Sequence, residues 1–93
     1  MPITFELPSA LQQYVAGERV VVLEHSCGTV SQALAALGER CPGVVDRVLT
    51  EQGELRPHVN VFVGTESVRF IGGLAAPVRD GDTIVIVPAV SGG

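Results

Sequence analysis

Residues 83–87 read Thr-Ile-Val-Ile-Val and decide the fold. All five residues are β-branched and four of them are aliphatic, a composition that favours an extended strand. Because the segment is almost continuously apolar, we expect a central strand that is covered on at least one face. Asp80-Gly81-Asp82 directly before it is typical of a turn, in which Asp side chains accept hydrogen bonds from backbone amides. The sequence therefore predicts a sheet built around this strand.

Further strands are predicted near the N-terminus and in the second half of the chain. In residues 3–7, apolar and polar side chains alternate with a period of two, which indicates a strand with one buried face. Residues 19–24 (RVVVLE) are rich in β-branched residues and predict a second strand that forms a hairpin with the first. Residues 59–63 (VNVFV) predict a third strand. Residues 64–67 predict a turn, and residues 68–70 a short strand after it.

One main helix is expected between the second and third strands. Thr29 and Gln32 have the spacing of a capping box, in which each side chain hydrogen-bonds to the backbone of the other residue. The helix should run over Val30–Arg40, because Pro42 interrupts it. A short helical turn is expected over residues 44–49. The apolar face of the main helix consists of Val30, Ala33, Leu34, Leu37 and Cys41. Cys41 is therefore expected to be a small buried hydrophobe.

The order of these elements predicts an α+β fold. A chain of 93 residues supports one domain. A first hairpin, a crossing helix and a last strand beside the first match the β-grasp, or ubiquitin-like, arrangement, with a mixed sheet packed on one main helix. We expect residues 1–88 to form this domain and residues 89–93 to form a flexible C-terminal tail.

The composition excludes several classes of function. The net charge is −4, and all six basic residues are arginines, so the clustered positive charge of a nucleic-acid binder is absent. An anionic membrane surface is a poor partner for the same reason, and no apolar stretch is long enough to cross a bilayer. The N-terminus lacks the pattern of a secretion signal. Two cysteines make neither a disulfide framework nor the ligand set of a common iron–sulfur cluster, so a reduced, cytoplasmic protein is expected.

The histidine, cysteine and aspartate residues of this chain do not form a recognisable metal-binding or catalytic motif. His25 and Cys27 lie close together and His58 is distant, which does not supply four zinc ligands at workable spacing, so we expect no metal site. Cys27 precedes the helix N-terminus, where a thiolate is favoured, but no base is evident beside it. Asp80 and Asp82 are accounted for by their turn. Since no nucleophile–base pair can be named, we expect that the chain is not an enzyme.

The last residues of the sequence are its most informative feature. Pro88-Ala89 is followed by Val90, Ser91, Gly92 and Gly93, directly after the last strand. A terminal carboxylate must be activated before it reacts, typically as an acyl-adenylate, and residues without Cβ allow the backbone to enter a narrow channel. No phosphate-binding loop is present, so the activating machinery must be another protein. A merely flexible tail is the alternative interpretation of these glycines.

Several motifs in the last third of the chain resemble one known family. They are Val59-Asn60-Val61-Phe62-Val63, Val68-Arg69-Phe70, Gly72-Gly73-Leu74-Ala75, Asp80-Gly81-Asp82 and Pro88-Ala89-Val90-Ser91-Gly92-Gly93. In this combination the chain resembles the ThiS/MoaD family of ubiquitin-like sulfur carriers, and within it the CysO-type branch of cysteine biosynthesis.

The resemblance implies a reaction cycle in which Gly93 is the reacting group. An E1-like enzyme would adenylate its carboxylate with ATP and Mg²⁺, and a thiocarboxylate would follow. Val90, Ser91 and Gly92 would be threaded into the partner, and no cofactor would be bound by the chain itself. A PLP-dependent cysteine synthase would receive the sulfur, and a metallopeptidase would release the cysteine.

Other functions stay open at this stage. One alternative with the same chemistry is the small subunit of molybdopterin synthase, whose partner is the large subunit. Another is a thiocarboxylate donor for thiamine synthesis or tRNA thiolation. A protein modifier and a plain interaction module are alternatives of another class. The sequence contains no lysine, so the chain cannot form lysine-linked polymers of itself.

Alternation along the strands predicts a docking surface. If Val61 and Ile84 face the helix, then Phe62, Val85 and Val87 face the other way and form an apolar patch beside the tail. Scattered surface apolar residues are the alternative. Exposed arginines such as Arg69 and Arg79 are candidates for charge pairs with a partner.

Overall fold

The computed structural model describes residues 2–24 and 28–88. Its centre is a five-stranded mixed sheet with the strand order β2-β1-β5-β3-β4. The strands are β1 (Ile3–Glu6), β2 (Val20–Leu23), β3 (Val59–Val63), β4 (Glu66–Ser67) and β5 (Thr83–Pro88). The predicted last strand is therefore the middle strand of the sheet, and the predicted strands over residues 3–7, 19–24 and 59–63 are confirmed.

The pairing around β5 is that of the β-grasp fold. β1 and β2 form an antiparallel hairpin, and β5 lies parallel to β1. On its other side β5 pairs antiparallel with β3 over the full length of β3, from Val63 opposite Ile84 to Val59 opposite Pro88. The expected α+β, ubiquitin-like architecture is confirmed.

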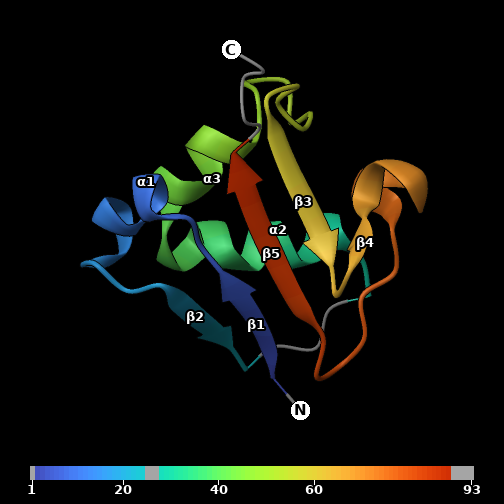
Figure 1. Ribbon diagram of the computed structural model, residues 1–93, viewed down its shortest axis with the longest axis horizontal. Helices are drawn as coiled ribbons and strands as arrows, with labels where there is room; N and C mark the ends of the chain where they lie inside the picture. Colours follow the sequence, from blue (N-terminus) through green and yellow to red (C-terminus); the bar gives the residue numbers. More distant parts are fainter. Residues whose placement is uncertain (1, 25–27, 89–93) are drawn as a thin grey trace.

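Two helices cover one face of this sheet. α2 (Val30–Arg40) and α3 (Pro42–Val48) lie behind the strands in Figure 1, and the opposite face carries neither of them. α2 has the predicted bounds, and α3 begins earlier than the predicted helical turn, with Pro42 in its first turn, where a missing amide is tolerated. The core between the layers is entirely apolar: Ile3, Phe5, Leu23, Val30, Ala33, Leu34, Leu37, Val44, Val48, Val61, Val68, Ala76 and Ile84 have no exposed surface.

The start of α2 has a modified capping box. The Thr29 hydroxyl accepts a hydrogen bond from the Gln32 amide at 3.2 Å, as predicted. The Gln32 side-chain oxygen, however, accepts from the amide of Gly28 at 2.7 Å, one residue before the position that the usual motif uses. Both side chains still satisfy free amide groups at the helix N-terminus. At the other end Cys41 is a free, buried thiol, as expected.

The hairpin connection was not predicted in its detail. α1 (Ser9–Gln12) and the 3₁₀ helix η1 (Gln13–Val15) lie between β1 and β2. They bury Leu11 and place Tyr14 against α3, where Gly43 leaves room for the ring: a Cβ there would stand 2.8 Å from the Tyr14 Cδ1 atom.

The segment after β3 also differs from the sequence prediction. The turn is shorter than residues 64–67, because Glu66–Ser67 already forms β4, which pairs antiparallel with the end of β3. The strand predicted over residues 68–70 was wrong: Val68–Phe70 is a 3₁₀ helix, η2. A second one, η3 (Gly73–Ala75), follows after Gly72, whose φ of 118° suits glycine.

The burial of η2 explains why a strand fails there. Val68 is fully buried while Phe70 is 88% exposed, although two residues that far apart on a strand would share one face. The turn also brings Arg69 over the start of β3. Its Nη2 atom donates to three carbonyl oxygens, those of Val59 at 2.6 Å, Arg56 at 3.0 Å and Pro57 at 3.4 Å.

Within residues 2–24 and 28–88, no helix has the length and apolar character needed to cross a membrane.

Candidate functional site

The sheet face that points away from α2 and α3 is the most extended candidate for a binding surface (Figure 1). One row of paired residues runs across all five strands on this face. In strand order it consists of Val20, Glu6, Val85, Phe62 and Ser67. Because side chains alternate along each strand, the neighbouring inward residues belong to the core.

The three residues predicted to dock a partner meet on this face. Phe62 on β3 lies opposite Val85 on β5, and Val87 lies two residues further along β5, opposite Asn60. All three side chains are half-buried. The inward residues Val61 and Ile84 are completely buried. The structure thus confirms the predicted alternation, while the docking role of the three residues stays a prediction.

A shallow hollow adjoins this patch. Its volume is about 190 Å³, and it is lined by Glu6, Leu7, Pro8, Arg19, Val85, Ile86 and Val87. Its lining includes apolar side chains of β5, the Glu6 carboxylate of β1 and the guanidinium of Arg19, the residue directly before β2. The face can therefore offer a partner both apolar contact and polar groups of either sign.

Sequence reasoning missed two members of the same face. Val20 and Val22 on β2 are 37% and 40% exposed, and Val20 belongs to the row that contains Phe62. The alternation used for β3 and β5, applied to residues 19–24, would have found them. Phe70 was missed as an exposed aromatic because a strand was expected where η2 lies.

The predicted reacting tail lies outside the described residues. This applies to Gly93, to Val90, Ser91 and Gly92, and to the proposed domain boundary after residue 88. The structure places Pro88, the last residue of β5, opposite Val59 in the sheet.

The other candidate residues have structural roles or lie elsewhere. Asp82 accepts a hydrogen bond from the Arg79 amide at 2.8 Å, which confirms its predicted turn function. Arg69 is engaged with the backbone carbonyls at the start of β3. In the part of the chain that the structure describes, no group of three or more His, Cys, Asp or Glu side chains is placed to hold a metal ion. His25 and Cys27 are outside that part.

The family model of the ThiS family matches residues 7–93. The chain belongs to the ThiS family. Its sequence is 35% identical to the sulfur carrier protein CysO of Mycobacterium tuberculosis over 95 aligned positions, which cover 100% of both chains. The match therefore includes the last strand and the residues after it.

Solved structures agree with this assignment. The fold superposes on a chain of the Amycolatopsis orientalis BexX/CysO complex with a TM-score of 0.86 and 40% sequence identity, covering 98% of this chain and 99% of that one. SAMP1 from Haloferax volcanii gives a TM-score of 0.81 at 32% identity, with 100% of both chains covered. This member of the ThiS family is thus CysO-like in sequence and fold.

Proposed function

We propose that this protein is a sulfur carrier whose C-terminal Gly93 is adenylated by an E1-like enzyme and then converted to a thiocarboxylate. The observation that carries the proposal is the match to CysO over the full length of both chains, together with a family match that extends to residue 93. The chain has the Gly92-Gly93 end that such activation chemistry needs.

The chemistry of the described residues supports a carrier that is acted upon. Its core is apolar throughout, and its one described cysteine, Cys41, is buried inside it. ATP and Mg²⁺ are accordingly assigned to the activating enzyme, which supplies the nucleotide site, and the carrier contributes the carboxylate of Gly93. Glycine at the last two positions leaves that carboxylate open to the nucleotide and then to the attacking sulfur.

The outer sheet face is the proposed docking surface for this enzyme. Phe62, Val85 and Val87 form its apolar centre, and Val20 and Val22 extend it. The BexX/CysO crystal structure supports docking on another protein, since there a CysO protein is held in a complex.

We place the carrier in cysteine biosynthesis in the cytoplasm. Its resemblance to CysO favours delivery of sulfur to a PLP-dependent cysteine synthase, followed by release of the new cysteine by a metallopeptidase. The small subunit of molybdopterin synthase, with the large subunit as partner, is the alternative within the same chemistry.

Protein modification is a second candidate function. It is favoured by the similarity to SAMP1 over the whole chain and by the relationship to small archaeal modifier proteins. In that case Gly93 would form an amide bond with a lysine of another protein. The chain has no lysine of its own, so conjugates would contain one copy at each site rather than lysine-linked chains.

Deletion of Gly93 tests the proposal. In an assay of ATP–pyrophosphate exchange with the E1-like enzyme of the same cells, the wild-type chain should stimulate exchange and the shortened chain should not. Ser91→Ala, which keeps both glycines, is the matched control and should retain exchange. Undiminished exchange with the chain lacking Gly93 would refute the assignment of the reacting group.

A further inference from the structure

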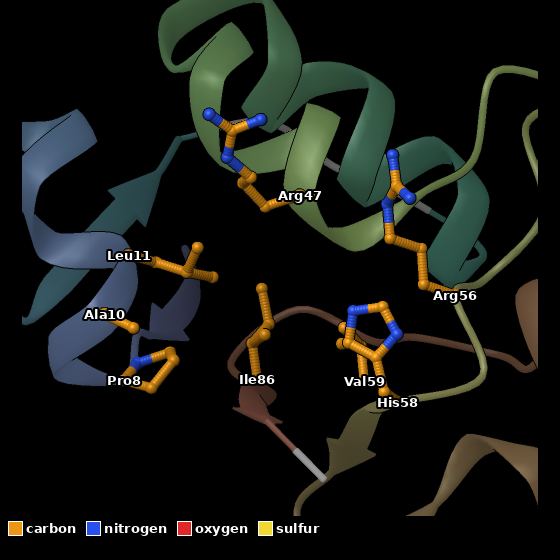
Figure 2. A pocket seen from close by; sticks show the side chains of 8 residues that line it. All are labelled: Pro8, Ala10, Leu11, Arg47, Arg56, His58, Val59 and Ile86. Carbon is orange, nitrogen blue, oxygen red and sulfur yellow. The ribbon is translucent and has the colours of Figure 1, made fainter.

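A second hollow lies at the end of the sheet where β1 and β5 finish and β3 begins. Its volume is about 290 Å³. Figure 2 shows its lining, which comes from α1, α3, β5 and the segment that leads into β3: Pro8, Ala10, Leu11, Arg47, Arg56, His58, Val59 and Ile86. The proposed sulfur transfer gives this pocket no task.

Two kinds of side chain form the pocket. The floor is apolar, with Leu11 and Ile86 at its centre, both of them core residues. The border carries three nitrogen-bearing groups, the guanidiniums of Arg47 and Arg56 and the imidazole of His58 (Figure 2). No carboxylate side chain lines it. Such a pocket suits a ligand that is apolar at one end and anionic at the other.

The two guanidinium groups are held by neutral partners. Arg47 donates from Nε to the Tyr14 hydroxyl at 2.9 Å, and its guanidinium lies 5.0 Å from the centre of the Tyr14 ring. Arg56 donates from Nη2 to the backbone carbonyl of Asp46 at 3.0 Å. Among residues 2–24 and 28–88, neither arginine forms an ion pair with a carboxylate. The carboxylates of Asp46 and Glu51 line a neighbouring hollow together with both arginines, but they do not line this pocket.

Arg56 has a buried hydrogen-bond donor that is not satisfied by the described residues. Its Nε atom is buried and has no hydrogen-bond acceptor within the described part of the chain. A buried donor without a partner is unfavourable, because it has lost water and gained nothing in exchange. An anion that draws the Arg56 guanidinium toward the pocket would satisfy this donor.

We propose that this pocket binds a small carboxylate with a short apolar body. The apolar body lies on Leu11 and Ile86, and the carboxylate accepts hydrogen bonds from Arg56 and His58. A carboxylate fits the planar fork of an arginine through two parallel hydrogen bonds. Inorganic phosphate matches the charge but leaves the apolar floor unused. This site is independent of the sulfur-carrier function.

The pocket lies close to the end of the last strand, β5. Ile86 belongs to β5 and lies two residues before its end at Pro88, and Val59, which also lines the pocket, pairs with Pro88. A ligand on this floor would therefore contact both β5 and β3 near the end of β5 at Pro88.

An NMR titration of the full chain with sodium butyrate tests the site. We expect saturable shifts of backbone amide signals at Leu11, His58 and Val59. Butanol and butylammonium, which have the same alkyl body without the anion, should give less than a fifth of the butyrate shifts. Arg56→Gln should raise the butyrate dissociation constant at least fivefold. Arg79→Gln removes the same charge outside the pocket and should leave the constant unchanged.

Other results would overturn the proposal. Equal shifts with butanol or with inorganic phosphate would show that the pocket does not recognise a carboxylate with an apolar body. Shifts that do not saturate would show that butyrate has no specific binding site. If Arg56→Gln fails to fold, the comparison of butyrate with butanol on the wild-type chain decides alone. A glutamate side chain of a bound protein has the same chemistry, so a blocked Ala-Glu-Ala peptide is a further arm. Tighter binding of that peptide than of butyrate would overturn the assignment to a small molecule.

Discussion

Arg69 shows how one side chain takes the place of missing strand contacts. β4 pairs only with the last two residues of β3, so the carbonyl of Val59 at the start of β3 lies beyond its reach. Arg69 donates to that oxygen at 2.6 Å from η2. A residue that the sequence presents as a free surface cation is therefore part of the fold.

Replacing Arg69 with Gln should destabilise the protein. The lost charge-assisted hydrogen bonds are worth about 1.5 kcal/mol or more in the free energy of unfolding, which urea denaturation measures. Arg79→Gln should stay within about 0.5 kcal/mol of the wild type, as surface substitutions generally do. Equal stability of the two variants would show that the contacts of Arg69 contribute little.

Phe62 tests the proposed docking face. Phe62→Asp places a charge at the centre of the apolar row and should weaken binding to the E1-like partner at least tenfold, as measured by calorimetric titration. Because the side chain is only half-buried, the free energy of unfolding should fall by no more than about 1 kcal/mol. Phe70→Asp changes an exposed phenylalanine on η2 and serves as the control. Unchanged partner binding by Phe62→Asp would show that the E1-like partner does not dock on this face.

At the scale of elements, the N-terminus of α2 depends on two side-chain hydrogen bonds. Thr29→Ala removes the acceptor for the Gln32 amide and should lower the free energy of unfolding by about 1 kcal/mol. Thr29→Ser keeps the hydroxyl and should restore most of that stability. Thermal unfolding followed by circular dichroism gives both values. If Thr29→Ala has the same free energy of unfolding as the wild type, the hydrogen bond between Gln32 and Gly28 alone is enough to stabilise the start of α2.

Regular elements were predictable because their patterns are long enough to show a period. α2 has three turns of apolar spacing and a capping residue, and β3 and β5 alternate or run apolar over at least five positions. α1 has four residues and η2 has three, about one turn each, so no periodicity can reveal them. η2 is set by contacts distant in sequence, namely the burial of Val68 and the reach of Arg69 to Val59.

The same reasoning applies to the candidate site. Phe62, Val85 and Val87 were placed on one face by alternation alone, and that placement is confirmed. The pocket with Arg47, Arg56 and His58 was not foreseen, because it joins segments that only the tertiary fold brings together. The tail had to be argued from chemistry and resemblance, since its residues carry no periodic pattern.

At the scale of the whole molecule, one apolar core holds a sheet whose outer face is free of α2 and α3. Every fully buried side chain of the described residues lies within residues 3–86, before the tail begins. Under the proposed function the two parts of the chain have separate tasks: residues up to Pro88 would fold and present a surface, and Gly93 would react in the site of another protein.

The intact mass of the chain recovered from its own cells under sulfur demand tests this account most directly. The account predicts a species in which one oxygen is replaced by sulfur, with the change confined to the C-terminal peptide, and a further species carrying one cysteine residue would assign it to cysteine biosynthesis. An abundant chain of unmodified mass, without such a species and without larger conjugates, would contradict the central claim that Gly93 carries sulfur.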